Sequence, residues 1–213
     1  MKRGLSLWWF VLALLTACVP VTPTLPADEG TQPLLVERFA PPHPDWALFD
    51  TPTGAAYALG GELYLEDRAG NMAVYTPLLN HTWDNVVLSV RVRQVEGSFN
   101  NWMGVLCRYQ DDVNYYLFAI SADGYYLILR VAGGETVRLA GPVASDSIAQ
   151  GLNTNLLEVR CEGSTFSMSV NRTFLVSRTD PVLPSGGIGL FADAVGGSGT
   201  TTVAFDHLTV TTP

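Results

Sequence analysis

Short stretches in which apolar and polar residues alternate cover most of the chain after residue 33. In the stretch 86–93, VVLSVRVR, every even position is apolar, and the odd positions become polar toward its end. A period of two places alternate side chains on opposite faces and is typical of a β-strand with one face in a core. The pattern therefore predicts a protein built mainly from strands.

The same alternation, together with the turn residues between the stretches, predicts fourteen strands. They cover residues 34–39, 55–59, 62–66, 72–75, 86–95, 103–110, 115–121, 125–131, 136–139, 155–161, 165–170, 173–177, 187–192 and 202–210. Turns are indicated by Gly60-Gly61, by Asp111-Asp112-Val113-Asn114 and by Ala122-Asp123-Gly124. No long amphipathic helix interrupts the strands, so we expect an all-β fold, a two-sheet antiparallel jelly-roll sandwich.

The first eighteen residues have a different pattern. Lys2 and Arg3 precede an apolar run over residues 5–15, which is too short to span a bilayer, and Leu15-Thr16-Ala17-Cys18 follows. This order resembles a bacterial lipoprotein signal, and the alternative is an ordinary signal peptide with a chance cysteine. The resemblance implies a signal peptide at 1–17, a lipid on Cys18 and an extracytoplasmic protein anchored to the cell membrane or outer membrane. The Pro- and Thr-rich residues 18–33 would be a tether, and residues 34–213 would form the jelly-roll domain.

Charge excludes some partners. The chain has a net charge of −8, and Lys2 is its one lysine. This balance argues against binding to nucleic acid and against electrostatic docking on anionic lipid. It also leaves a chain processed before Cys18 without a lysine for Schiff-base chemistry. We expect a monomer.

Two cysteines remain if Cys18 is lipidated. Cys107 and Cys161 each alternate with apolar neighbours in strand-like runs, and an oxidising compartment favours a disulfide between them. We expect a bridge between neighbouring strands in the core, the alternative being two buried free thiols.

The order of several short motifs resembles a known superfamily. The motifs are Glu37-Arg38-Phe39, Gly61-Glu62-Leu63-Tyr64, Gly104-Val105-Leu106-Cys107-Arg108, Asn114-Tyr115-Tyr116-Leu117-Phe118, Gly187-Ile188-Gly189-Leu190 and Phe205-Asp206-His207-Leu208-Thr209-Val210. Over residues 34–211 the chain is similar to the concanavalin A-like lectins and glucanases, and most similar to the branch of 3-keto-disaccharide hydrolases and laminin-G-like domains. The resemblance implies the jelly-roll fold and a role in glycan binding or cleavage.

Catalytic motifs are missing from the sequence. Glucanases of this superfamily use an E-x-D-x-x-E or E-x-D-x-E strand, and the nearest run, 62–67, lacks the middle acid. There is no G-x-S-x-G motif of a serine hydrolase. A hydrolase would need other carboxylates at the ligand site, of which Asp111, Asp112 and Asp123 are the nearest in sequence. The superfamily also implies a structural Ca²⁺ site, which would fall on Glu37 and Asp206.

Aromatic and arginine side chains give the best indication of a ligand. If Cys107 points into the core, the alternation turns Arg108 outward, and hairpins would place Arg108, Tyr116, Tyr126 and Arg130 on one concave face with Trp102 at its rim. Rings and arginines on such a face bind sugars. The alternative is that these aromatic residues pack in the core or across strands.

The sequence therefore favours the first of three functions. The first is a non-catalytic lipoprotein domain that binds a glycan or another cell-surface polymer. The second is a hydrolase of the 3-keto-disaccharide type, and the third is a structural lipoprotein that docks a protein partner.

Overall fold

The computed structural model describes residues 32–42, 45–70, 72–195 and 199–213. The chain divides after Gly30 into two compact units, and all the described residues belong to the second, Thr31–Pro213. Cys18 and the predicted signal peptide lie outside the described residues. In the described part of the chain, no helix has the length and apolar character needed to cross a membrane.

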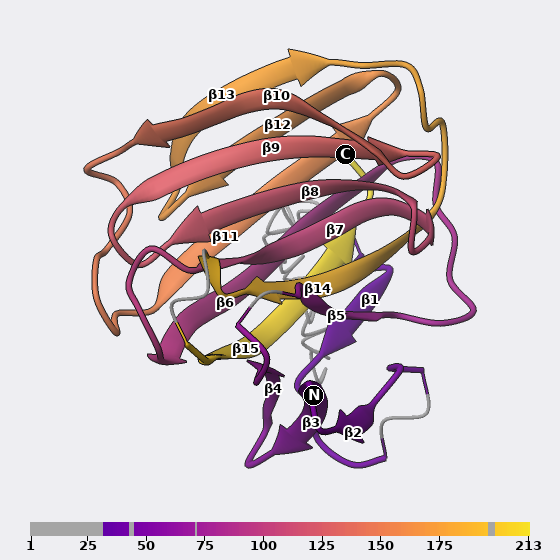
Figure 1. Ribbon diagram of the computed structural model, residues 1–213. Helices are drawn as coiled ribbons and strands as arrows, with labels where there is room; N and C mark the ends of the chain where they lie inside the picture. The colour runs from indigo at the N-terminus through magenta and orange to yellow at the C-terminus, as the bar shows by residue number, and fades with distance from the viewer. Residues whose placement is uncertain (1–31, 43–44, 71, 196–198) are drawn as a thin grey trace, which may run out of the picture. The chain divides into compact units, whose positions relative to one another are not determined.

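The second unit consists of two antiparallel sheets that pack face to face (Figure 1). The larger sheet has the order β13 (Thr173–Thr179), β12 (Thr165–Val170), β11 (Asn155–Glu162), β6 (Val86–Glu96), β15 (Thr201–Thr211), β4 (Glu62–Asp67), β3 (Gly54–Leu59) and β2 (Phe49–Thr51), and β1 (Leu35–Glu37) pairs with β15. The smaller sheet has the order β10 (Glu135–Ala144), β9 (Tyr125–Ala132), β8 (Asn114–Ser121), β7 (Trp102–Asp111), β14 (Gly187–Asp193) and β5 (Val74–Pro77).

This architecture confirms the predicted all-β sandwich of two antiparallel sheets. Each of the fourteen predicted strands overlaps an observed one, and the three-residue strand β2 is the addition. The glycine turn between β3 and β4 also forms as predicted, with φ of 63° at Gly60 and 87° at Gly61. Two successive positive φ values suit the right-handed twist of a hairpin, and glycine adopts them without a steric penalty.

The core lies between the two sheets. On β6 the even-numbered residues Val86, Leu88, Val90 and Val92 are buried there, as their spacing predicts. From the smaller sheet, Met103, Val105, Phe118, Ile120 and Ile128 point toward them and belong to the same apolar cluster. Each sheet thus has an inner face in this core and an outer face turned away from it.

A disulfide joins the two sheets through the core. Cys107 on β7 and Cys161 on β11 are bonded, and each is at most 1% exposed. The pairing is as predicted, but the bridge links opposite sheets and not neighbouring strands. Alternation alone showed that both cysteines point inward, and an inward residue meets the facing sheet as readily as its own neighbours. Closing a loop with a sequence separation of 54 stabilises the fold by about 4 kcal/mol in the chain-entropy description.

Candidate functional site

Three of the residues predicted to bind a ligand lie in the core. Arg108, Tyr116 and Tyr126 are 2%, 0% and 9% exposed, respectively. The predicted outward orientation is therefore wrong for these three, and the alternative of core packing holds for both tyrosines.

A β-bulge turns Arg108 inward. The pairing of β7 with β14 and with β8 shifts register after Cys107, and Arg108 has a left-handed φ of 53°. A bulge adds one residue to its strand, so Arg108 does not follow the alternation that turns Cys107 inward. Its guanidinium donates to the carbonyl oxygens of Pro184 and Leu183, the latter at 3.2 Å, and to that of Gly163 at 2.9 Å. Burial lowers the pKa of Arg108. Arg108 thereby ties the chain between β13 and β14 to the sandwich interior.

Tyr116 and Arg130 meet at Asp180, which begins the same connection. The Tyr116 hydroxyl donates to one Asp180 carboxylate oxygen at 2.6 Å, and Arg130 forms an ion pair with the other at 2.6 Å. Burial and the bond to Asp180 raise the pKa of Tyr116 to about 12. Burial alone would raise the pKa of Asp180, but its bonds from Tyr116, the Val182 backbone and Arg130 lower it overall. Arg130 thus has a structural partner inside the protein.

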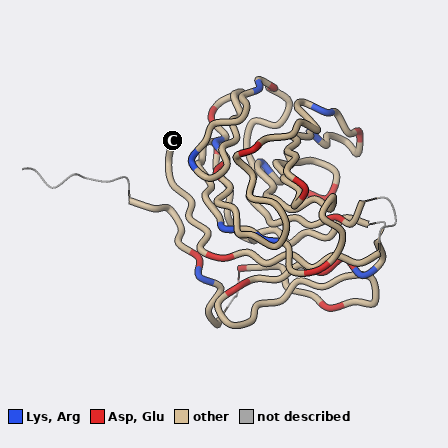
Figure 2. The backbone as a smooth tube through the Cα atoms, turned by 90° about the vertical axis from the view of Figure 1, so that its left-hand side faces the viewer, with Lys and Arg blue, Asp and Glu red and all other residues tan. Residues whose placement is uncertain are grey.

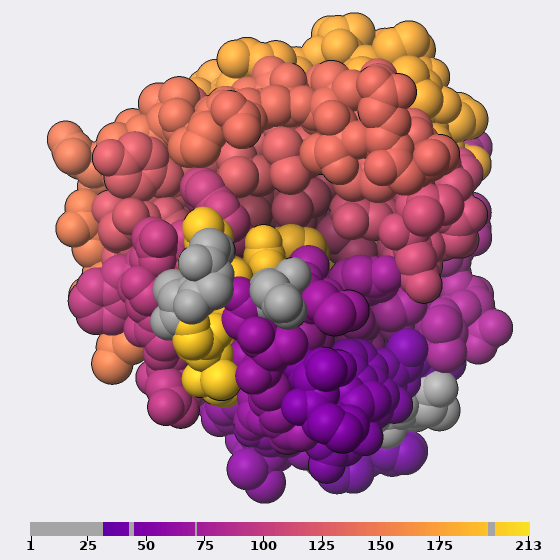
Figure 3. Space-filling view, viewed as in Figure 1, coloured from indigo at the N-terminus to yellow at the C-terminus, as the bar shows by residue number. Residues whose placement is uncertain are grey.

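The outer face of the six-stranded sheet carries a second apolar cluster. Leu106, Leu117, Ala119, Leu127 and Phe191 form its floor and are at most 6% exposed. Tyr75, Trp102, Tyr109, Tyr115 and Leu129 pack on that floor and are partly exposed. Figure 3 shows this face hollowed across its middle, between the pink and orange residues of β9 and β10 and the violet residues of the N-terminal strands. We call this hollow, with the aromatic residues that line it, the aromatic groove.

Three tyrosines from different strands gather at one end of the aromatic groove. The ring centroids of Tyr75, Tyr109 and Tyr115 lie 6.1 to 6.4 Å apart in every pairing. The Tyr109 hydroxyl donates to Asp112 at 2.6 Å. Burial and Asp112 raise the pKa of Tyr75 and of Tyr109, so both phenols are neutral donors at neutral pH. Beside them a pocket of about 410 Å³ opens toward β2 and β3.

The other end of the aromatic groove holds Trp102 and Tyr125. Both line a pocket of about 220 Å³ together with Asp123, which accepts a short hydrogen bond from Ser121. Trp102 is thus the one member of the predicted set that lies on this outer face. Trp102 and Tyr109 are seven positions apart on β7, which is roughly 20 Å of strand. The aromatic groove is long enough for several sugar rings in a row.

The three carboxylates that a hydrolase would need do not meet. Asp111 and Asp112 lie at the hairpin before β8, and Asp123 lies at the hairpin after it. The eight-residue strand β8 spans about 24 Å, whereas the carboxyl pair of a glycosidase lies within about 10 Å. Asp111 moreover accepts hydrogen bonds from the Val113 amide and the Asn114 side chain, which close the hairpin.

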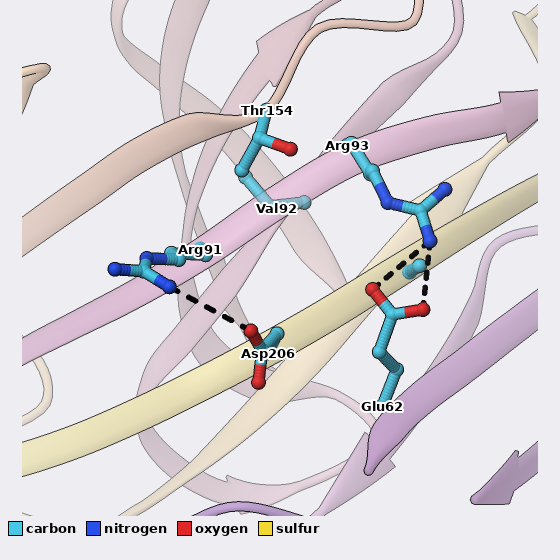
Figure 4. Close-up of a pocket in the computed structure, with 7 residues that line it drawn as sticks. Glu62, Arg91, Val92, Arg93, Thr154 and Asp206 are labelled. Atoms are coloured by element: carbon cyan, nitrogen blue, oxygen red, sulfur yellow. Dashed lines mark hydrogen bonds and ion pairs between the residues drawn. The ribbon is translucent and has the colours of Figure 1, made fainter. Parts of the chain in front are cut away.

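A further pocket, of about 320 Å³, lies on the outer face of the nine-stranded sheet (Figure 4). Its charged residues are paired with one another. Arg93 donates to both oxygens of Glu62, at 2.9 and 2.7 Å, and Arg91 lies 3.9 Å from Asp206. Because the two arginines and the two carboxylates neutralise each other, the pocket does not favour a charged ligand of either sign.

The groups around Glu37 and Asp206 do not form a Ca²⁺ site. The Glu37 carboxylate accepts bonds from the Phe39 amide at 2.6 Å and the Trp46 indole at 3.2 Å. Asp206 faces Arg91 and lies 2.5 Å from the His207 ring. Calcium needs six to eight oxygen ligands, and the described residues contain no group of three or more His, Cys, Asp or Glu side chains that could hold a metal. The structure therefore does not support the predicted calcium site.

Solved structures share this sandwich. The carbohydrate binding module CBM66 from Bacillus subtilis is 15% identical with a TM-score of 0.54, over 79% of this chain and 96% of that chain. A protein of unknown function with a galectin-like fold, also from Bacillus subtilis, is 12% identical with a TM-score of 0.61, over 84% of this chain and 96% of that chain. The GH43 protein BlXynB from Bacillus licheniformis is 13% identical with a TM-score of 0.63, over 91% of this chain and 41% of that chain.

No family model and no curated protein matches the sequence. At these identities the structural likeness establishes the fold, a β-sandwich of the kind found in carbohydrate-binding and galectin-like domains.

Sequence reasoning missed Tyr75, Tyr109 and Tyr115. Adjacent tyrosines at 115–116 and at 125–126 put one ring on each face, so the residue type could not identify the face. The residues that share a strand face with each tyrosine indicate which way its ring points. Tyr116 shares its parity with Phe118 and Ile120 in an unbroken apolar row, which is typical of the core.

The Asp180 cluster predicts a specific acid sensitivity. Asp180→Asn removes the counter-ion of Arg130 and should lower the free energy of unfolding at pH 7 by about 3 kcal/mol. The lowered carboxyl pKa contributes stability that is complete above about pH 4 and is lost as the pH falls through the folded-state value. Wild type should therefore lose more stability than Asp180→Asn between pH 7 and pH 3 in urea unfolding. The control is Asp146→Asn at an exposed position, and equal losses in Asp180→Asn and wild type would contradict the assignment.

Proposed function

We propose that this domain binds a glycan chain in the aromatic groove without cleaving it. The observation that supports the proposal most strongly is the row of partly exposed rings on a buried apolar floor, from Trp102 to Tyr109. Pyranose and furanose rings have apolar C–H faces that stack on aromatic rings, while their hydroxyls need donors and acceptors at the edges. The tyrosine hydroxyls and Asp112 provide those polar groups at one end.

The fold comparison agrees with this use of the sandwich. One structural neighbour is itself described as a carbohydrate binding module, and it matches over nearly its full length. The separation of Asp111 and Asp112 from Asp123 favours binding over hydrolysis. A role in which a protein partner occupies the same face has no comparable support from the described residues.

We further propose that the domain works outside the cytoplasm, anchored by a lipid on Cys18. The support is the sequence pattern at residues 2–18, with its positive start, short apolar run and small residues before the cysteine. In this arrangement residues 18–33 would hold the aromatic groove away from the membrane surface, where a polymer can reach it.

Substitution of a ring in the groove tests the binding proposal. Tyr109→Ala should weaken the binding of an oligosaccharide retained by wild type about tenfold, because one stacking partner and its hydroxyl are lost. The matched control is Tyr57→Ala, since Tyr57 lies on the other sheet and stacks on Tyr64 at 5.2 Å. Calorimetry on the full chain, in a detergent without sugar head groups, measures both variants. Equal weakening by both variants, or none by Tyr109→Ala, would contradict the proposed site.

The lipid anchor has its own test. Cys18→Ser removes the acceptor thiol, so the chain expressed in a bacterial host should leave the detergent-extracted membrane fraction and lose the mass of a diacylglycerol group. Thr16→Ala keeps a small residue before the cut and should remain lipidated. An unmodified Cys18 in the wild-type chain, shown by mass spectrometry, would refute the anchor.

A further inference from the structure

Among the described residues, acidic side chains outnumber basic ones around the aromatic groove. Asp193 lies on the outer face of the six-stranded sheet, because it pairs with Trp102 in the register of β14 and β7. Asp112 and Asp123 lie at the two ends of the groove. On the same face Arg138 is the one arginine among the described residues of the six strands, and it lies on the edge strand β10 opposite Leu129. The other two arginines of this sheet, Arg108 and Arg130, point into the interior.

The arginines that pair with carboxylates do so elsewhere. Ion pairs in the described part of the chain join Arg68, Arg91, Arg93 and Arg160 to acids on the nine-stranded sheet, and Arg130 to Asp180 inside the protein. Figure 2 shows that charged residues of both signs are few and lie scattered along the backbone. The acids of the aromatic groove are in none of these pairs. Asp112 and Asp123 accept bonds from neutral hydroxyls of Tyr109 and Ser121, which leave the negative charge in place.

Asp193 has the most unusual position of these acids. It is half-buried, and no hydrogen bond or ion pair to its carboxylate is found among the described residues. It pairs with Trp102 at one end of the aromatic groove, whereas Asp112 lies beside Tyr109 at the other end. Burial, Asp112 and Asp193 together raise the pKa of Tyr115, which lies in the same groove. Each end of the aromatic groove therefore holds a carboxylate that forms no ion pair with a cationic side chain among the described residues.

An unpaired carboxylate that is partly removed from water is costly, and a cation brought into the groove relieves that cost. An anionic ligand would meet repulsion at both ends of the groove, because Arg138, the one arginine of this face among the described residues of the six strands, lies on the edge strand β10. The aromatic rings add to the same preference, since the faces of tyrosine and tryptophan rings attract cations.

We propose that the aromatic groove selects glycan chains that carry protonated amino groups and rejects chains that carry carboxylates or sulfates. The proposal rests on the proposed function, because it names the chemical class of the glycan that the same groove binds. The rings recognise the sugar faces, while Asp193 beside Trp102 and Asp112 beside Tyr109 recognise ammonium groups at the two ends of the groove.

The test compares three oligosaccharides of equal length on the full chain in a detergent without sugar head groups. The probes are a glucosamine hexamer, its N-acetylated counterpart and a uronic acid hexamer, measured by calorimetry at pH 6. We expect the glucosamine hexamer to bind about tenfold more tightly than the neutral hexamer, and the uronic acid hexamer to bind at least tenfold more weakly than the neutral one. Added salt should reduce the first difference, since screening weakens interactions between exposed charges.

A variant pair locates the charge that makes the difference. Asp193→Asn should reduce the ratio of glucosamine to N-acetylglucosamine affinity about fivefold. The control Glu158→Gln makes the same change of charge on the outer face of the nine-stranded sheet, where Glu158 is exposed on β11, and should leave that ratio unchanged. An equal reduction by both variants would show a general effect of net charge and would overturn the role of Asp193.

The outcomes for the two proposals are distinct. Equal binding of the three hexamers, or tightest binding of the uronic acid hexamer, overturns the charge selectivity and leaves glycan binding intact. Failure of all three probes to bind, together with failure of a broad panel of neutral oligosaccharides, overturns the proposed function and the selectivity with it.

Discussion

The apolar layer between the two sheets decides where every other side chain of the strands points. Val90 and Val92 from one sheet meet Phe118 and Ile120 from the other, and each is fully buried. Once these residues are fixed inside, the pleat sends their neighbours to the outer faces. The six-stranded sheet is unusual because its outer face is apolar as well, with Leu106, Leu117 and Leu127 buried there. That second apolar face is what makes the aromatic groove possible.

The interior also holds a polar element that is separate from ligand binding. Asp180, Tyr116 and Arg130 share hydrogen bonds beneath the connection between β13 and β14, and Arg108 binds backbone carbonyls of the same connection. This connection carries the chain from the edge of the nine-stranded sheet to β14, which lies between β7 and the edge strand β5 of the six-stranded sheet. The cluster and the disulfide therefore both join the sheets, one through polar contacts and the other through a covalent bond.

Strand periodicity predicts most of the fold, and it predicts less of the site. The alternation at 86–93, the glycine pair at 60–61 and the two inward cysteines are local signals, and the structure agrees with each of them. The orientation of Arg108 depends on a bulge, which changes the alternation after Cys107 and has no local signature in that run. Asp180 reaches Tyr116 across 64 residues, a separation over which the sequence alone indicates no pairing. The residues predicted for a concave binding face do lie on strands of the six-stranded sheet, but four of the five, Arg108, Tyr116, Tyr126 and Arg130, point into the interior.

The comparison of the two outer faces explains why one of them is the stronger candidate for binding. The pocket of Arg91, Arg93, Glu62 and Asp206 satisfies its own charges, whereas the aromatic groove leaves rings and carboxylates partly exposed without a cationic partner in the described residues. Sites that bind sugars need both apolar ring surface and polar groups at its margin. The aromatic groove has both along one face.

The most direct test of this account is a solution map of the tyrosine rings by NMR, with assigned ring signals recorded as an oligosaccharide that binds is added. The account predicts that the signals of Tyr75, Tyr109 and Tyr115 shift together, while those of Tyr57 and Tyr64 on the other sheet and of buried Tyr116 stay in place. Shifts confined to Tyr57 and Tyr64 would place the ligand on the nine-stranded sheet and would contradict the account.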